Sequence, residues 1–301
     1  MGEIAEKLGL EHCSREGFLR LVDFLLTELP PRRMFTAHRT RPPAHEAFEF
    51  YPHPVFDLPL SGEKEICFSE GTEILRPGDV FQLPPAAWKL PRWTRPHEMA
   101  CLVFQEKFLR ITYVELDRPL AGGIRPVSTV FFHTGTAPGE EVRTLLRLLE
   151  RLGLAGDPGG AAPELFRGLL RLVRVMLERD ESPLPGKAQS TFRKVRHYLT
   201  ENSGAAITRE ETARRFKLNP GYLSRLFRAQ EGCSFSEFLI RLRLEQAAML
   251  LRETDLLVDE VADRCGYRST TFFTAAFKTR FGLPPARYRS SLGEERGGAG
   301  R

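Results

Sequence analysis

Two groups of polar and basic side chains near the carboxyl end have the types needed to contact a nucleic acid. The first contains Gly221, Ser224, Arg225 and Arg228, and the second contains Arg268, Thr270, Thr271, Thr274 and Lys278. Arginine can donate two hydrogen bonds to a guanine edge, threonine offers a hydroxyl and a methyl group to bases, and Lys and Arg pair with phosphates. These residues predict hydrogen bonding and charge pairing in the major groove of double-stranded DNA, and no catalytic role.

The members of the two groups are expected to divide the work. Arg225 is the best candidate for guanine O6 and N7. Arg228, Arg268 and Lys278 are better suited to phosphates, which fix the register of a protein on the duplex. An alternative for Arg225 is a helix-surface ion pair with an acid such as Glu231.

The second group lies in a sequence pattern typical of two helices joined by a tight turn. Ala262 is small where two helices would cross closely, and Gly266 falls where the turn needs a positive φ. Ser269 can cap the next helix, on which Phe273 and Phe277 are one turn apart and face one core. This pattern leaves the Thr and Lys residues between the two aromatics exposed.

The first group lies in a weaker version of the same pattern. Ala213 and Phe216 precede a turn at Lys217-Leu218, and Asn219 with Pro220 suits a helix start. The inward positions of that helix are Leu223, Leu226 and Phe227. A long helix over 235–252 would hold the two units at a fixed separation.

These residues resemble the AraC/XylS family of bacterial transcription regulators over roughly residues 190–291. The matching motifs are Tyr222-Leu223-Ser224-Arg225-Leu226-Phe227-Arg228, Arg243-x3-Ala247-x2-Leu250-Leu251 and Gly282-x2-Pro285-x2-Tyr288-Arg289. The resemblance implies an all-α tandem helix-turn-helix domain with two recognition helices in successive major grooves. By alignment with the family motif, it also implies that base contacts come from Gly221, Ser224 and Arg225 in the first helix and from Thr270, Thr271 and Thr274 in the second. It also implies a cytoplasmic protein of the bacterial nucleoid, and RNA polymerase as a partner if the protein activates transcription.

Three positions depart from the family pattern. Lys217 stands where the first turn often has Gly, and Thr212 replaces the usual aliphatic residue of the first scaffold helix. Both departures predict a less stable first unit. Ala275 sits where some relatives carry a base-reading Arg, so the second helix is expected to use thymine methyl groups and the backbone.

The front of the chain is expected to be rich in strands, so the whole chain is predicted to be α+β. Short apolar runs divided by Pro and Gly occupy about residues 34–114, with a hairpin turn at Ser61–Lys64 and another turn at Pro77–Val80. The pattern resembles the cupin-like sensor domain, an antiparallel β-barrel, of many AraC-type regulators. Residues 1–29 are predicted to form an amphipathic helix or helix pair, and residues 115–139 a loop-rich crossing.

Cupin enzymes hold a metal with His and Glu, so a metal-dependent cupin enzyme fused to a DNA-binding tail is the alternative function. The position expected for the late His is Lys89, and too few ligands remain for a divalent metal. We therefore expect no metal, no cofactor and no enzyme activity. The candidate ligands that this leaves as ordinary core or surface residues are His38, His45, His53, His97 and Asp57.

A small-molecule effector, such as a sugar, is expected in the mouth of the barrel. The residues predicted to bind it are His53, Trp88 and Trp93, because a polar ligand can stack on indole. The alternative is that both tryptophans are packing residues.

The remaining segments set the domain organisation. Helices predicted at about 140–180 complete a sensing and dimerisation domain over 1–182, and are expected to make a homodimer or to pack on their own barrel. A linker follows at 183–189, the DNA-binding domain covers 190–291, and residues 292–301 are expected to be disordered.

Charge and cysteine content agree with this organisation. The chain of 301 residues has a net charge of +5, and residues 190–291 hold 18 Lys and Arg against 11 Asp and Glu, as phosphate contacts require. The odd number of five cysteines favours reduced thiols in a cytosol, with a redox sensor as the alternative. No export signal and no membrane span is expected.

Overall fold

A computed structural model describes residues 2–10, 14–40, 49–85, 87–117, 129–180 and 187–298. The chain divides into two compact units, Met1–Pro183 and Leu184–Arg301, called here the sheet unit and the helical unit. Most of the expected linker at 183–189 lies outside the described residues, and the first helix after it begins at Lys187. A mostly-β front and an all-helical carboxyl part confirm the predicted α+β class.

Ten strands in the described residues of the sheet unit form two sheets. The strands are β1 (Arg33–Thr36), β2 (Glu49–Phe50), β3 (Val55–Gly62), β4 (Lys64–Phe68), β5 (Gly71–Leu75), β6 (Asp79–Leu83), β7 (Trp88–Arg92), β8 (His97–Phe104), β9 (Leu109–Leu116) and β10 (Thr129–His133). The larger sheet has the order β1-β6-β3-β8-β9-β10, and the smaller has the order β2-β7-β4-β5. All pairs are antiparallel except β1 with β6.

Two expectations for this region were wrong. The turn at Ser61–Lys64 does not close a hairpin, because β3 pairs with β6 and β8 whereas β4 pairs with β5 and β7. A register shift between Pro59 and Ser61, followed by Gly62 at φ 69°, redirects the chain from one sheet to the other. The crossing at 115–139 also contains a strand, β10, which pairs with β9 and extends the larger sheet.

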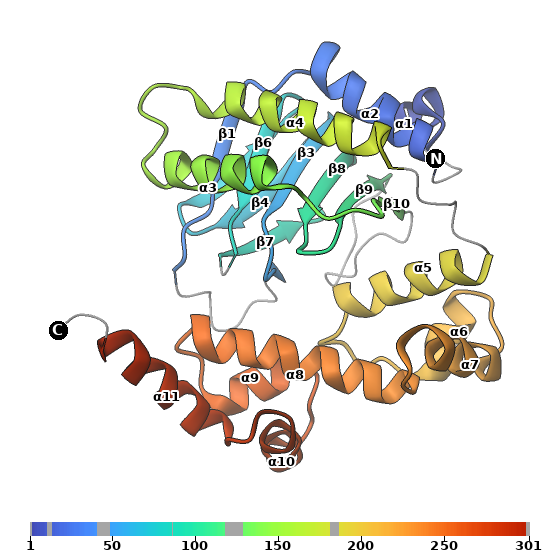
Figure 1. Cartoon of the computed structure of the whole chain (residues 1–301), viewed down its shortest axis with the longest axis vertical. Coiled ribbons are helices and arrows are strands. Elements are labelled where there is room, and N and C mark those ends of the chain that lie inside the picture. The colour runs from blue at the N-terminus through green and yellow to red at the C-terminus, as the bar shows by residue number, and fades with distance from the viewer. Residues whose placement is uncertain are drawn as a thin grey trace. The chain divides into compact units, whose positions relative to one another are not determined.

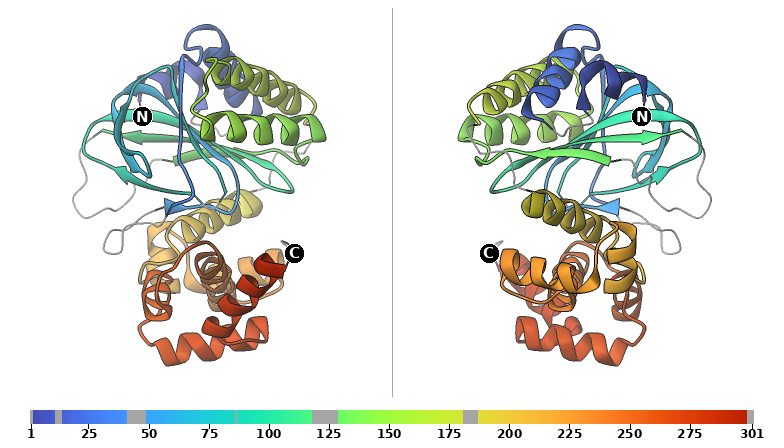
Figure 2. Two further views of the ribbon diagram at one scale, coloured as in Figure 1. Left: turned by 90° about the vertical axis from the view of Figure 1, so that its left-hand side faces the viewer. Right: turned by 90° about the vertical axis from the view of Figure 1, so that its right-hand side faces the viewer.

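Four helices cover one face of the larger sheet. They are α1 (Glu3–Leu8), α2 (Arg15–Thr27), α3 (Glu140–Leu154) and α4 (Ala162–Glu178) (Figure 1). Ser14 caps α2 by accepting a hydrogen bond from the Gly17 amide, as the predicted helix pair requires. Phe18 of α2 and Phe166 of α4 join Phe56 of β3 in one core, and both views of Figure 2 show these helices on one side of the strands.

The two sheets share a second core on their other faces. Val55 and Phe81 of the larger sheet pack with Ile66 and Phe68 of the smaller one. Apolar side chains from both sheets thus meet in a single cluster, as in a barrel or sandwich. Whether this unit is cupin-like stays a prediction.

The helical unit has seven helices in its described residues. They are α5 (Lys187–Glu201), α6 (Arg209–Arg215), α7 (Pro220–Glu231), α8 (Phe235–Glu253), α9 (Val258–Arg264), α10 (Thr270–Phe281) and α11 (Pro285–Gly298). Helix α8 contacts α7 on one side and α9, α10 and α11 on the other, as Figure 1 shows. Helix α11 continues to Gly298, and the disorder expected from residue 292 stays a prediction.

Candidate nucleic-acid interface and sensor site

The first helix pair, α6 and α7, is fixed by reciprocal capping. Thr208 and Glu211 form a capping box at the start of α6, with the Glu211 amide 3.1 Å from the Thr208 hydroxyl. The Asn219 side chain accepts hydrogen bonds from the Gly221 and Tyr222 amides at 2.8 and 3.4 Å, and Pro220 is the first residue of α7. These bonds satisfy amides that a helix start leaves unpaired.

In the first helix pair, both residues that depart from the family pattern, Lys217 and Thr212, have a local structural effect. Lys217 adopts φ 53° in the turn, a left-handed conformation that costs an L-residue about 1–2 kcal/mol. Thr212 is buried, but its hydroxyl donates to the Thr208 carbonyl at 2.8 Å. The backbone bond satisfies that hydroxyl, so strain in this unit lies at Lys217 and not at Thr212.

The second helix pair, α9 and α10, depends on glycine and on an arginine from α8. Gly266 has φ 77° in the turn, and Ser269 caps α10 by accepting from the Phe272 amide. Arg243 of α8 donates to the carbonyls of Ser203 and Ala205, both at 2.8 Å, next to this turn. Burial lowers the pKa of the Arg243 guanidinium, which the two carbonyls keep hydrogen-bonded.

All nine residues expected to contact DNA lie on or at the start of the second helix of a pair. Ser224 and Thr274 are partly exposed, and the other seven are exposed: Gly221, Arg225, Arg228, Arg268, Thr270, Thr271 and Lys278. The inward positions Leu223, Leu226 and Phe227 of α7 and Phe273 and Phe277 of α10 are buried. Each of these helices therefore has one face in the core and one polar face toward solvent.

The acid considered as a partner for Arg225 is engaged elsewhere. The Glu231 carboxylate is 2.6 Å from Arg241 and 3.7 Å from Arg196. Arg225 is therefore exposed on α7 without that ion pair. Ser224, one position earlier, donates to the Pro220 carbonyl at 3.1 Å and accepts from Arg209 at 3.3 Å.

Sequence reasoning missed two kinds of residue in this unit. Arg243 and Arg289 were recognised only as motif positions, yet Arg289 donates to the Leu251 carbonyl and Arg243 ties α8 to the loop after α5. Phe272 had no predicted role, and it is among the most exposed large apolar side chains of the described residues. Its place in the first turn of α10, next to two exposed threonines, was the available signal.

The structure separates the three residues expected to bind an effector. Trp88 is buried, with its indole N–H 3.0 Å from the Thr40 hydroxyl. Trp93 is buried between Lys64, whose ammonium is 3.3 Å from the ring centroid, and the stacked His97 ring. Both arrangements are those of packing residues, and an effector contact at either indole stays a prediction.

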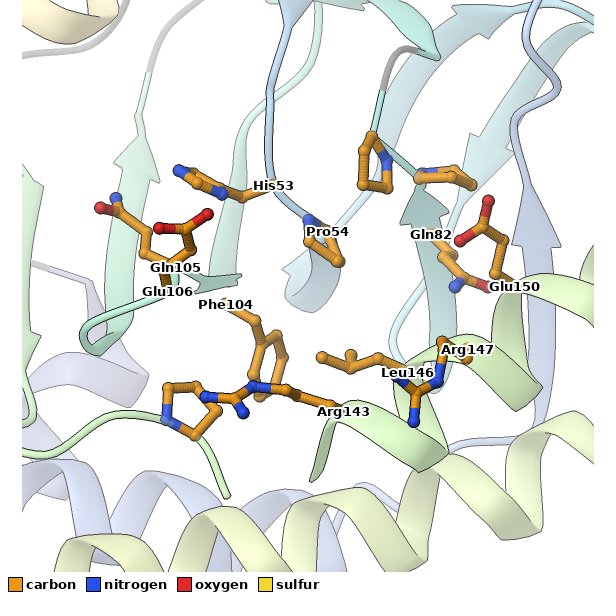
Figure 3. A pocket seen from close by; sticks show the side chains of 13 residues that line it. His53, Pro54, Gln82, Phe104, Gln105, Glu106, Arg143, Leu146, Arg147 and Glu150 are labelled. Atoms are coloured by element: carbon orange, nitrogen blue, oxygen red, sulfur yellow. The ribbon is translucent and has the colours of Figure 1, made fainter. Parts of the chain in front are cut away.

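His53 alone of the three lines a cavity of about 290 Å³ (Figure 3). Figure 3 shows His53 and Glu106 on one side and Arg147 and Glu150 on the other, with apolar side chains between them. The apolar members of the lining are Pro54, Pro84, Pro85, Phe104, Pro138 and Leu146. Burial lowers the pKa of His53, which favours its neutral, hydrogen-bonding form.

Lys89 forms a buried ion pair where the sequence predicts a missing metal ligand. Its ammonium hydrogen-bonds to Asp57 and lies 3.4 Å from Glu49. Burial opposes the charge, but the carboxylates of Asp57 and Glu49 outweigh it and raise the pKa of Lys89. Among the described residues, no three His, Cys, Asp or Glu side chains are grouped to hold a metal ion; His45 lies outside them.

Cys265 is buried and Cys101 is partly buried. Burial raises the pKa of Cys265 to about 12, and it also raises the pKa of Cys101, so both are held as thiols. No described helix is both long enough and apolar enough to cross a membrane.

Comparison with known proteins adds to this geometry. Residues 212–291 match a family model described as a helix-turn-helix domain. YijO of Escherichia coli K12, an uncharacterized HTH-type transcriptional regulator, is 29% identical over 236 residues, or 78% of this chain and 81% of its own. RhaR of Enterobacter sp. 638, an HTH-type transcriptional activator, is 26% identical over 151 residues, or 50% of this chain and 54% of its own.

Among solved structures, the DNA-binding domain of AdpA in complex with a target DNA is 32% identical. That match covers 35% of this chain and 96% of the AdpA domain, with a TM-score of 0.35. The matched helix-turn-helix domain begins inside α6 and includes α7, α9 and α10, and the 236 matched residues of YijO are more than the helical unit alone contains. The chain therefore contains an AraC-type helix-turn-helix domain and is a DNA-binding transcription regulator, similar over most of its length to HTH-type transcriptional regulators.

Proposed function

We propose that this regulator binds DNA through α7 and α10 together and changes its activity when the sheet unit binds a small molecule. The observation that carries the DNA-binding part is that eight predicted contact residues lie at exposed or partly exposed positions of two capped helices, and that Arg268, also exposed, comes just before the cap of α10. Helix α8 contacts the helices of both pairs, so it would hold the two readers one helical turn of DNA apart, about 34 Å.

Within this arrangement, Arg225 is proposed to recognise guanine, and Arg228, Arg268 and Lys278 to contact phosphates. Arg225 is exposed, and Glu231 is already bonded by two other arginines. Ser224 and the threonines of α10 would contact bases through hydroxyl and methyl groups. A buried Thr274 would have argued against this, but its side chain is partly exposed.

The test begins with selection of bound duplexes from a random library by the full-length protein at near-physiological salt. A motif with two elements about one helical turn apart is expected. Arg225→Ala should lower affinity by about 1–3 kcal/mol and relax one base position, whereas Lys278→Ala should weaken all sites alike and reduce the salt dependence. Arg151→Ala, the same charge change on exposed α3 of the sheet unit, is the control. An Arg225→Ala protein with unchanged base preference would contradict the assignment.

The effector is proposed to bind in the cavity at His53. Its volume is close to the lower end of small-ligand pockets, and its apolar middle is bordered by His53, Glu106 and Arg147. A ligand there should raise the midpoint of thermal unfolding, and Leu146→Trp, which fills the cavity, should abolish that shift. A ligand-dependent shift retained in Leu146→Trp would place the effector elsewhere in the sheet unit.

We further propose that the protein acts as a homodimer through α3 and α4. Leu148 and Leu154 of α3 and Val175 of α4 are exposed large apolar side chains. Sedimentation of Leu148→Glu should show a monomer, and a doubled DNA motif should become a single one.

Relatives named as activators, such as RhaR, support the proposal that this protein activates transcription, with RNA polymerase as its partner at the nucleoid. In vitro transcription with purified polymerase tests this proposal.

The alternative of a metal-dependent enzyme has little support in the described residues. The Lys89 ammonium hydrogen-bonds to Asp57, and its positive charge would repel a metal ion at that carboxylate. Metal analysis of the purified protein distinguishes the two functions, because stoichiometric iron, manganese or zinc would favour the enzyme.

A further inference from the structure

Phe272 is an exposed aromatic side chain in the first turn of α10, the helix that enters the major groove in the proposed function. Its side chain is 59% exposed, whereas the adjacent Phe273 is 0% exposed. Its amide is bound by the cap residue Ser269 at 3.3 Å, which places it in the first helical turn. Its ring centroid lies 6.2 Å from that of Tyr267, a tilted contact at the edge of the core.

The position of the ring is unfavourable for the isolated protein. A large apolar side chain left in water forgoes the free energy that burial against a partner would contribute. In a recognition helix, the first-turn side chains are those that reach base edges. The ring of Phe272 is therefore placed where a base pair would cover it.

The neighbours of Phe272 limit what this face can recognise. Thr270 and Thr271 are exposed beside it, and Ala275, one turn further along α10, is exposed and small. None of these side chains can form the bidentate hydrogen bonds that Arg makes to guanine or Asn and Gln make to adenine. The apolar group that a base pair offers in the major groove is the 5-methyl group of thymine.

We propose that Phe272 determines sequence specificity by packing its ring against the 5-methyl group of one thymine in the second recognition element. The methyl of Ala275 does not extend far enough to compete for the same space, so the phenyl ring is the largest side chain on this part of the helix. This inference rests on the proposed placement of α10 in the major groove. It predicts that specificity at this base pair depends on a single methyl group.

The experiment replaces each thymine of the selected site, one at a time, by uracil, which lacks only the 5-methyl group. Wild-type protein should lose about fourfold in affinity at one thymine of the second element, the change expected from one buried apolar carbon group. Phe272→Ala should bind the thymine and uracil forms of that position equally. At every other thymine, the two proteins should show the same thymine-to-uracil ratio.

Two variants control for general effects on the helical unit. Leu257→Ala removes another exposed apolar side chain, 62% exposed just before α9, and should keep the wild-type ratio at all thymines. Phe272→Leu keeps an apolar side chain and should retain part of the discrimination. Circular dichroism at 222 nm should be unchanged in Phe272→Ala, because the ring contributes little to the core.

Two results would overturn the inference, and they have different meanings. If wild-type protein selects a bipartite motif but Phe272→Ala keeps every thymine-to-uracil ratio, Phe272 does not read a methyl group, and the proposed function stands. If wild-type protein selects no motif, with or without candidate effectors, the proposed reading by α10 fails, and the inference fails with it.

Discussion

Replacing Gly266 by alanine would place a methyl group where the turn between α9 and α10 has no room. The added carbon would lie 2.9 Å from the Gly204 carbonyl oxygen and 2.9 Å from a terminal guanidinium nitrogen of Arg243. The backbone there has φ 77°, which an L side chain rarely adopts. Gly232, after α7, is a matched control, because it has φ 70° and no atom within 4 Å of the added carbon.

The two substitutions separate backbone strain from crowding. Left-handed backbone costs an alanine about 1–2 kcal/mol, offset by about 0.5–1 kcal/mol because alanine has less freedom than glycine when unfolded. Gly232→Ala should therefore lower the free energy of unfolding by about 1 kcal/mol. Gly266→Ala should add about 1–3 kcal/mol of overpacking, since Gly204 contributes a backbone atom that cannot turn away.

Unfolding of the helical unit can be measured separately from unfolding of the sheet unit in the full-length protein. Both tryptophans, Trp88 and Trp93, lie in the sheet unit, so their fluorescence reports unfolding of that unit. Circular dichroism at 222 nm during urea unfolding follows the loss of helix, and so it also reports unfolding of the helical unit. Gly266→Ala should move the helical transition to lower urea while the fluorescence transition stays in place.

Affinity for the selected DNA site is the second readout. Gly266→Ala should weaken binding to the second element of the motif more than to the first, because the turn aims α10. If Gly266→Ala and Gly232→Ala destabilise the helical unit equally, crowding against Gly204 and Arg243 contributes nothing, and the argument from the turn geometry is refuted.

Three further results are expected. Lys217→Gly should stabilise the helical unit by about 0.5–1 kcal/mol in the same urea assay, because it removes left-handed strain at φ 53°; a loss of stability would contradict this. Burial lowers the pKa of His97 to about 4 in the folded protein, so on acidification the unfolded chain binds a proton at this residue before the folded chain does. The free energy of unfolding of the sheet unit should therefore fall as the pH drops from about 6.5 toward 4, by at most about 1.4 kcal/mol per pH unit. His97→Gln should flatten that dependence in fluorescence-monitored unfolding. Lys89→Met should cost about 3–5 kcal/mol by leaving Asp57 buried and unpaired, and the added change Asp57→Leu should restore much of it; a single variant as stable as wild type would show that the pair is not structural.

The helical unit is largely predictable because its signals are local. Capping residues, a turn glycine and apolar positions at helical spacing all act within a few residues, so Asn219, Gly266 and Ser269 could be assigned from the chain alone. The same periodicity separated the buried Phe277 from the exposed Lys278. It also placed Phe273 in the core, as the structure confirms, but it gave no role to the adjacent Phe272, whose exposure became visible only in the packed α10.

The tertiary structure decided what depends on contacts between distant segments. The sequence placed strands near β3 and β4, but their membership in two different sheets follows from pairings with β8 and β7, far along the chain. Lys89 could be recognised as an unsuitable metal ligand, yet its pairing with Asp57 arises only when β7 and β3 face each other across the sheets. Composition and periodicity determine which residues are buried or capped locally, whereas register and sheet assignment are set by free energy shared among segments that no local pattern records.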